Sequence, residues 1–518
     1  MEWIVTFNLV MAILFTALYA YQYVYLIVAS FRKPKTYPDV EPSHRYAILI
    51  SARNEENVIG QLLDSIREQD YPAELLDAYV VADNCTDSTH TVAEEHGATV
   101  FARHNMQKVG KGYALDYLLR CIRKLKGKDY YDGFFVIDAD NLLDRRYVRE
   151  MDKCFSAGNR IVTSYRNSKN YGDNWISSGY SLWFLHEARH LNNARTLLGT
   201  SCAISGTGFL VCKDIINKQG GWKHYLLTED IEFTIDNIIK GEKITYCHAA
   251  MLYDEQPKKF SQSWHQRLRW SKGFLQVIRK HGGQLLKGIF TGKGFSFYDM
   301  FCTVAPMFFI SSVAILVNAA AFIYGIINPS LLNIELWEVA KTCASVYLLM
   351  FIIGASTGIY EWKNIHAPAW KKILSFFTFP IFMATYIPIS WVAFLTKVTW
   401  KPIAHTTSVS LNEVENSDLP DSGDDGTGIP AGTDVLTDNG AVPGTDSAKA
   451  PVTESAPATD VSVGTATPVP AEQQSGEESR TAESVSASPA PTETPESDRA
   501  VPSEIPATAG NLGTSGDN

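Results

Sequence analysis

The sequence predicts an α/β domain set between apolar segments and followed by a polar tail, and three observations lead to this prediction. Between about residues 45 and 291, short apolar runs of strand length alternate with amphipathic segments of helix length, the pattern of an α/β fold. Apolar segments long enough to cross a bilayer lie on both sides of this region. Residues 408–518 are rich in Pro, Ser, Thr, Ala and Gly, so we expect a disordered tail.

The first half of the domain contains three apolar runs that we expect to be strands and three segments that we expect to be helices. The strands are expected at 46–50, 78–82 and 99–102, and the helices at 61–69, 89–96 and 111–126.

A fourth apolar run, residues 134–137, ends in two carboxylates, Asp138 and Asp140. A short continuous apolar run is typical of a strand covered on both faces, as in a parallel sheet, whose ligands bind beyond the carboxyl ends of the strands. We therefore expect these aspartates to hold Mg²⁺ or Mn²⁺ beside the phosphates of a substrate. The alternative is a strand that runs into an acidic turn.

The second half of the domain carries three further polar motifs. A small-residue turn, 205–208, precedes an apolar run, and Glu229 and Asp230 lie at a predicted helix start, where the helix dipole favours negative charge. A helix at 264–270 places Gln266, Arg269 and Trp270 on one face. The segment that follows, 273–290, is amphipathic and basic, as expected for a helix in the membrane interface.

We expect four membrane-spanning helices, one near the N-terminus and three near 303–327, 336–360 and 373–396. The N-terminal segment is too long for a signal peptide and lacks a preceding basic residue. The basic residues that follow it, Arg32, Lys33 and Lys35, place the next domain in the cytoplasm. Lysines flank the last segment on both sides, so the side on which the tail lies stays open.

Charge is unevenly distributed along the chain. From Leu411 to the end there are 20 acidic and 3 basic residues, which leaves 43 basic and 36 acidic residues upstream, a formal charge of +7. A mildly basic folded part fits an enzyme that handles an anionic substrate at an anionic membrane surface. The basic residues form no stripe interleaved with aromatic residues, so we expect no nucleic-acid partner.

The cysteines show no paired metal spacing and no dense framework, which is typical of a reducing compartment. We expect free, buried thiols at all eight positions, 85, 121, 154, 202, 212, 247, 302 and 343.

Five motifs, in order on one α/β domain, resemble those of the membrane-bound family 2 glycosyltransferases, such as cellulose, hyaluronan and poly-N-acetylglucosamine synthases. The motifs are the turn Asn54-Glu55-Glu56, Asp83, Asp138-Ala139-Asp140, Thr228-Glu229-Asp230 and Gln266-Arg267-Leu268-Arg269-Trp270. The resemblance implies a GT-A nucleotide-diphospho-sugar transferase fold, inserted between transmembrane helices.

The domain boundaries that we expect from this resemblance divide the chain into five parts. They are an N-terminal transmembrane helix (1–31), a cytoplasmic catalytic domain (43–271), an interfacial amphipathic region (272–300), three transmembrane helices (301–400) and the disordered acidic tail (408–518).

The resemblance also implies a UDP-sugar donor and assigns residues to it. Ala52, Arg53, Glu55 and Asp83 would hold the uridine, with the Asp83 carboxylate accepting from the uracil ring. For Asn84 and Thr86, which follow Asp83, we favour a structural role in a turn with a helix cap. Lys111 would lie near the nucleotide. The alternative interpretation is that Lys111 is a solvated charge at a helix end.

Of the two aspartates after the fourth strand, the resemblance makes Asp138 a contact of the sugar or ribose and Asp140 the metal ligand. Asp230 matches the catalytic base of the family, and Glu229 would raise the pKa of Asp230 by like-charge repulsion.

Gln266, Arg269 and Trp270 resemble the family's acceptor and diphosphate motif. The guanidinium of Arg269 suits phosphate, and the indole of Trp270 suits stacking on a sugar ring. Residues 206–208 fall where the family has an acceptor loop. For Trp175, Trp183, His186 and Glu187, which could touch acceptor, we favour a core role.

The expected function is therefore inverting transfer of a glucose or N-acetylglucosamine unit to a growing polysaccharide by a multi-pass protein of the cell membrane. One alternative is transfer of a single sugar to a lipid-linked acceptor. A second is a nucleotide-binding membrane scaffold that works through its acidic tail without catalysis.

Overall fold

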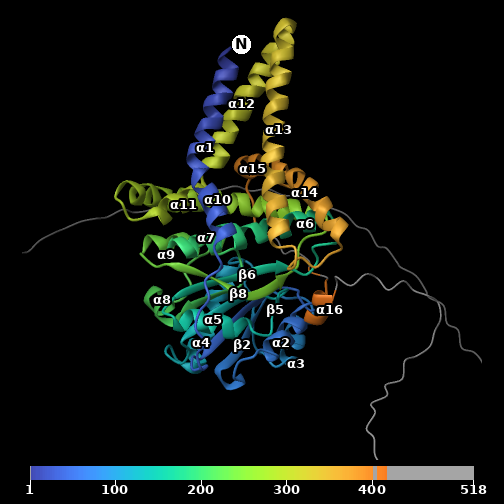
Figure 1. The fold of residues 1–518 in the computed structure, drawn as a ribbon. Helices are drawn as coiled ribbons and strands as arrows, with labels where there is room; N and C mark the ends of the chain where they lie inside the picture. Colours follow the sequence, from blue (N-terminus) through green and yellow to red (C-terminus); the bar gives the residue numbers. More distant parts are fainter. Residues whose placement is uncertain (1, 401–404, 406, 417–518) are drawn as a thin grey trace, which may run out of the picture. The chain divides into compact units, whose positions relative to one another are not determined.

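An eight-stranded mixed sheet lies at the centre of the part of the chain that the computed structural model describes, residues 2–400, 405 and 407–416. The strand order is β3-β2-β1-β4-β7-β6-β8-β5 (Figure 1). The strands are β1 (Tyr46–Ala52), β2 (Leu76–Asp83), β3 (Thr99–Arg103), β4 (Gly133–Asp138), β5 (Leu142–Leu143), β6 (Ile161–Ser168), β7 (Phe209–Cys212) and β8 (Ile244–Asp254).

The first four strands are parallel to one another, as expected, and both faces of this half of the sheet are covered. Alternate residues of β1 join different hydrophobic clusters, Ala47 and Leu49 on one face and Ile48 and Ile50 on the other. The helices between these strands are α2 (Ile59–Arg67), α3 (Thr89–Glu95) and α4 (Lys111–Lys126). The apolar run of β4 is thus a strand covered on both faces.

The sheet is mixed rather than wholly parallel, which corrects the setting we expected for β4. Its other neighbour, β7, runs antiparallel to both β4 and β6, and β5 runs antiparallel to β8. The chain enters β7 through Gly206 and Gly208, both at positive φ, and the Gly208 N–H donates to the Val136 carbonyl. These two glycines reverse the chain direction at little steric cost.

The remaining helices of the domain follow the strands in order. They are α5 (Tyr147–Ser156), α6 (Trp175–His186), a π-helical turn (Glu187–Asn192), α7 (Asn193–Leu198), α8 (Lys213–Gln219), α9 (Glu229–Ile239) and α10 (Phe260–Phe290). Helix α10 runs unbroken through residues 271 and 272, where we expected the catalytic domain to end.

Four helical stretches in the described part of the chain are long and apolar enough to cross a membrane. They are Trp3–Phe31, Met307–Ile327, Leu332–Tyr360 and Ala369–Leu395. The corresponding helices are α1 (Glu2–Phe31), α12 (Pro306–Ile327), α13 (Pro329–Tyr360), α14 (Ala369–Ala384) and α15 (Tyr386–Leu395), with α11 (Phe295–Val304) preceding α12.

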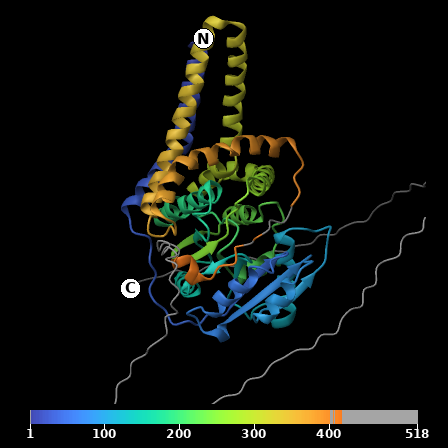
Figure 2. The same ribbon diagram turned by 90° about the vertical axis from the view of Figure 1, so that its right-hand side faces the viewer.

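Helices α1, α12 and α13 extend side by side away from the sheet, whereas α14 and α15 lie across the α/β domain (Figures 1 and 2). The break between α14 and α15 coincides with a buried anchor from α10. Arg267 donates to the Phe382 carbonyl (3.1 Å) and to Thr385 Oγ1 (2.6 Å), and its guanidinium lies over the Phe382 ring. Phe382 also packs against Tyr180 of α6. These contacts fix the last apolar stretch to the domain.

All eight cysteines lie in the described residues and are free, as expected. The expected burial of all eight is wrong for Cys343, which is exposed on α13. Cys85, Cys121 and Cys212 are half-buried.

Candidate active site

The carboxyl ends of β1, β2 and β4 bring the predicted donor residues to one edge of the sheet. Asp83, at the end of β2, is 4% exposed and forms an ion pair with Arg103. Asp83 also accepts from the Asn84 side chain (3.1 Å), and Asn84 adopts positive φ in the turn that follows. The Asp83 carboxylate therefore already has two partners within the protein, Arg103 and Asn84.

The turn after β1 carries three predicted donor contacts. Ala52 is fully buried, and Arg53 lies over the ring of Trp400 with its Nη1 atom lacking a partner among the described residues. The Glu55 N–H donates to Thr89 Oγ1 (2.8 Å), which fixes the turn against α3. The Arg53 guanidinium is thus a buried donor that a ligand can satisfy.

Lys111 and Asp138 form an ion pair where α4 begins and β4 ends. Lys111 Nζ also donates to the Gly206 carbonyl (2.8 Å). Burial alone would lower the pKa of Lys111, but the Asp138 and Glu229 carboxylates raise it above its usual value. Lys111 is therefore not a solvated charge at a helix end.

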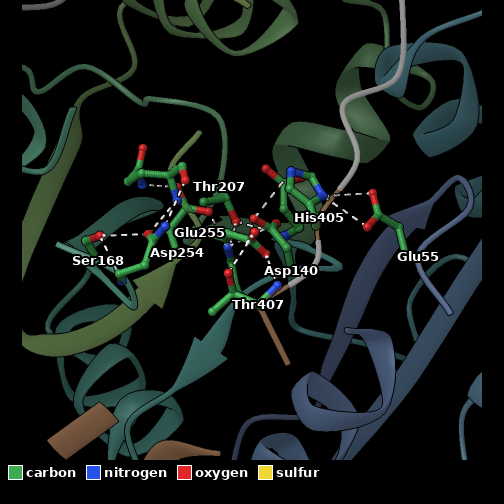
Figure 3. A network of polar contacts seen from close by, with 12 residues as sticks. Glu55, Asp140, Ser168, Thr207, Asp254, Glu255, His405 and Thr407 are labelled. Atoms are coloured by element: carbon green, nitrogen blue, oxygen red, sulfur yellow. Dashed lines mark hydrogen bonds and ion pairs between the residues drawn. The ribbon is translucent and has the colours of Figure 1, made fainter. Parts of the chain in front are cut away.

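Asp140 lies in a buried cluster of carboxylates together with Glu55, Asp254 and Glu255 (Figure 3). Asp140 is 4% exposed, and burial and the neighbouring carboxylates raise its pKa well above the usual value. Its Oδ1 atom accepts a long hydrogen bond from the Asn141 side chain (3.4 Å). Buried negative charge of this kind favours a nearby cation.

A segment from beyond α15 reaches into this cluster. His405 lies between Glu55, at 3.0 Å from Oε2, and Asp140, at 3.7 Å from Oδ2 (Figure 3). Burial alone would lower the pKa of His405, but Asp140 and Glu55 raise it to about 10. Two residues on, Thr407 donates to Glu255 through its N–H (3.0 Å) and its hydroxyl (2.9 Å).

Sequence reasoning missed the residues at the ends of β6 and β8. Arg166 of β6 forms an ion pair with Asp254, which also accepts from Gln256 (2.9 Å). Lys169 is 8% exposed, and its ammonium has no hydrogen-bond partner among the described residues. The sequence feature that could have indicated them is the pair of carboxylates Asp254 and Glu255 at the end of an apolar run.

The donor set suits a hard divalent cation. Mg²⁺ and Mn²⁺ prefer oxygen ligands, and Asp140 is buried, with His405 Nε2 at 3.7 Å from its Oδ2 atom. Asp138 is bound by Lys111. The described residues contain no ready group of three metal-binding side chains. Asp140 therefore fits a cation whose other ligands come from outside the protein.

Glu229 and Asp230 begin α9 and face the same edge. Burial and the Asp230 carboxylate raise the pKa of Glu229 to about 7. Burial raises the pKa of Asp230, and the Ile231 backbone N–H and the charge of Lys111 partly offset this rise. Lys111 thus acts on both Asp138 and Asp230.

Helix α10 packs closely on the start of α9. A Cβ on Gly273 would lie 2.5 Å from the Thr228 side chain, so this position admits only glycine without a shift. Arg269 donates to the Leu227 carbonyl (3.1 Å), and the Arg269 charge acts on both Glu229 and Asp230. The structure therefore brings Arg269 beside the two carboxylates.

The other two residues of this motif have different surroundings. The Gln266 side-chain oxygen is buried and has no hydrogen-bond partner among the described residues. Trp270 packs edge-on against Tyr180 and Phe184 of α6, with ring centroids at 5.7 and 6.1 Å. Gln266 therefore offers an unused acceptor, whereas Trp270 joins a cluster of aromatic rings.

The residues for which we favoured a core role differ in burial. His186 is buried, and burial lowers its pKa to about 3. Trp175 stacks on Phe260 and is 36% exposed. Glu187 accepts from the Ser205 hydroxyl (2.6 Å) beside a cavity of about 20 Å³, which has room for about one water.

Comparison with known proteins identifies the family to which the α/β domain is similar. Residues 42–273 match the family model described as glycosyltransferase like family 2. The chain therefore contains a family 2 glycosyltransferase domain, and the resemblance drawn from its five motifs is confirmed. The mixed sheet with helices on both faces agrees with the GT-A fold that the resemblance implies.

Individual relatives are distant. The chain is 23% identical to the probable glycosyltransferase YdaM of Bacillus subtilis over 71% of its own length and 88% of that protein. It is 24% identical to the β-monoglucosyldiacylglycerol synthase of Synechocystis, of which it covers 49%, and 23% identical to the poly-β-1,6-N-acetyl-D-glucosamine synthase of Staphylococcus aureus, of which it covers 58%.

Among solved structures, the chain is similar to a mannosyltransferase from Pyrobaculum calidifontis in complex with GDP-Man and Mn²⁺. The TM-score is 0.44 and the identity 17%, over 74% of this chain and 97% of that chain.

Proposed function

We propose that this protein is a membrane-embedded, inverting glycosyltransferase that moves a glucose or N-acetylglucosamine unit from a UDP-sugar to a growing polysaccharide. One observation carries the proposal. Lys111 is the ion-pair partner of Asp138, and its charge also acts on Glu229 and Asp230. A donor-side carboxylate and the proposed base are thus held around a single lysine.

The reaction is a single displacement at the anomeric carbon. The acceptor oxygen forms a bond to that carbon while the bond from the carbon to the UDP oxygen breaks, and UDP leaves with the electron pair. Asp230 takes the proton from the attacking hydroxyl, opposite the leaving group, so the configuration inverts. Burial raises the pKa of Asp230, which makes it a stronger base than an exposed aspartate.

The donor is held by groups that are unsatisfied without it. Arg53 and Lys169 each have a buried cationic donor atom without a partner in the described residues, and anionic phosphate oxygens suit both. Asp140 would hold Mg²⁺ or Mn²⁺, which supplies positive charge to the departing diphosphate. Ala52, Glu55 and Asp83 line the same edge for the uridine.

We place α1, α12 and α13 across the membrane, with the catalytic domain on the cytoplasmic side. Their outer surfaces expose large apolar side chains such as Leu9, Leu316 and Leu348. The lysines and arginine that follow α1 favour the cytoplasm for the domain. We place α14 and α15 at the membrane interface, because they pack on α6 and α10.

The second candidate is transfer of one sugar to a lipid-linked acceptor. Similarity to β-monoglucosyldiacylglycerol synthases favours it, because that name describes sugar transfer to a lipid. Three upright helices are also few for a polysaccharide channel.

The test is turnover of radiolabelled UDP-glucose and UDP-N-acetylglucosamine by the full-length protein in membranes. Asp230→Asn should lower turnover by about 10²–10⁴-fold, because general base catalysis contributes about that factor. Asp214→Asn, which removes an exposed carboxylate on α8, is the matched control. Removal of divalent metal by a chelator should abolish turnover, and Mg²⁺ or Mn²⁺ should restore it.

Undiminished turnover in the Asp230→Asn variant would overturn the proposed mechanism. Sizing the labelled product then separates the two acceptors, because a polymer is retained on a sizing column whereas a single-sugar product extracts with lipid.

A further inference from the structure

A groove outside the proposed active site lies between α10, α11 and the start of α12. Its cavity volume is about 330 Å³. Ile278, Gly282, Gly283 and Leu286 of α10 form one wall. The lining is almost wholly apolar, so a polar ligand would lose hydrogen bonds on entering it.

The groove faces away from the catalytic domain. Val277 and Leu285 of α10 are fully buried in a cluster with Ile231 and Ile235 of α9, which fixes the side of α10 that meets the domain. Gly283 is two residues from Leu285, and Leu286 is nine residues from Val277, each about half a turn around an α-helix. These two residues of the groove wall are therefore on the far side of α10.

The opposite wall connects the groove to an apolar stretch of membrane-spanning length. It consists of Phe301, Ala305 and Phe309, and Phe309 lies within the candidate span Met307–Ile327. Phe309 is 46% exposed. The groove thus opens where α12 would enter the bilayer, and lipid chains are the apolar molecules present at that depth.

Basic side chains border the same face of α10. Arg279, Gly283, Leu286 and Phe290 have the spacing of one helix face. Arg279 and Lys287 are exposed, and neither forms an ion pair within the described residues. Free cations beside an apolar groove match an anionic headgroup attached to an apolar chain.

We propose that this groove binds one acyl chain of an anionic phospholipid from the cytoplasmic leaflet, with the headgroup phosphate at Arg279 and Lys287. The proposal rests on the membrane placement of α12 proposed above. The bound lipid fastens α10, which carries Gln266 and Arg269, to the membrane surface.

Gly283 allows the groove to be filled without disturbing the fold. A Cβ on Gly283 would meet nothing within 4 Å, and leucine is a better helix former than glycine. Gly283→Leu should therefore occupy the groove and leave the packing of α10 intact. Gly283→Ala is the matched control, since it improves the helix in the same way but adds only one methyl group.

The experiment uses the full-length protein in nanodiscs that contain a phospholipid with a photoactivatable acyl chain, and mass spectrometry locates the labelled peptides. We expect the anionic probe to label peptides from residues 278–286 and 301–309. Gly283→Leu should lower this labelling by about fivefold, and Gly283→Ala should change it by less than twofold. The double variant Arg279→Gln with Lys287→Gln should lower labelling by the anionic probe only.

Labelling of the exposed α13 surface around Val346 and Ile352 is the internal reference. Labelled α13 with an unlabelled groove would overturn this inference and leave the membrane placement standing. Loss of both would overturn the membrane placement itself. Equal labelling of the groove by anionic and zwitterionic probes would overturn the assignment of an anionic headgroup.

Discussion

Glu229 is buried and Asp230 beside it is half-buried, and Lys111 and Arg269 balance the negative charge of this acidic pair. Burial disfavours the ionised carboxylates, and each also disfavours ionisation of the other. The two cations oppose this effect and keep a base available near neutral pH. The same four residues thus set both the protonation state of the base and the charge near the departing diphosphate.

The pH dependence of turnover should report this pair. The base works only when it is ionised, and burial raises the pKa of Asp230, so turnover should fall on the acid side at a higher pH than an exposed aspartate would give. In Glu229→Gln the neighbouring negative charge is gone, the pKa of Asp230 falls, and the acid limb should move to lower pH. Rates in single-turnover assays from pH 5 to 9 measure the shift, and an unmoved limb would contradict it.

Lys169 offers a second test at the level of one residue. Its buried ammonium lacks a hydrogen-bond partner in the described residues and lies among Asp140, Asp254 and Glu255. A hydrogen bond to a charged group contributes about 1.5–3 kcal/mol, so Lys169→Met should raise the KM for the UDP-sugar by about 10–100-fold. Lys128→Met, at an exposed site, is the control. An unchanged KM would show that Lys169 does not hold the donor.

At the level of elements, the segment 405–416 bridges distant parts of the chain. His405 contacts Glu55, 350 residues away, and Val414 packs on Leu142 and Tyr253. Val414 is 2% exposed and belongs to the short helix α16 (Leu411–Asn416). This apolar contact fixes the end of the segment and so holds His405 and Thr407 over the carboxylate cluster.

Val414→Asp should release this segment, because an unpaired buried polar group costs about 1–3 kcal/mol. We expect amide hydrogen exchange in the peptide 405–416 to accelerate by about 5–100-fold. This includes exchange of the Thr407 N–H, which donates a hydrogen bond to Glu255. Asn412→Asp adds the same charge at an exposed position of α16 and should leave exchange unchanged. Equal exchange in both variants would mean that Val414 does not hold the segment.

Local sequence patterns predicted the first half of the domain well. The expected helix 111–126 matches α4, because Gly110 and Gly127 bound an amphipathic run. Asp138, Lys111 and Asp230, which the motifs single out, lie close to one another. In contrast, the antiparallel setting of β7, the Arg267 anchor and the approach of His405 depend on partners far along the chain. Hydrophobic periodicity carries no information about such long-range contacts.

On the scale of the whole molecule, the continuous helix α10 connects chemistry to membrane. Its first half carries Arg269 beside the base and anchors α14 through Arg267, and its second half forms the groove at α12. A shift of α10 relative to the bilayer would therefore change the position of Arg269 relative to Asp230. This coupling makes the orientation of the chain in the membrane a property that the mechanism depends on.

The proposed orientation can be tested with single cysteines in intact cells. Asn328→Cys lies between α12 and α13, and Lys128→Cys lies on the surface of the catalytic domain after α4. If α12 and α13 cross the membrane as a hairpin, a membrane-impermeant maleimide should label residue 328 from outside and residue 128 only after permeabilisation. The background should carry Cys343→Ser, because Cys343 is exposed. Labelling of both positions from the same side would contradict the topology and remove the basis for a lipid at α10.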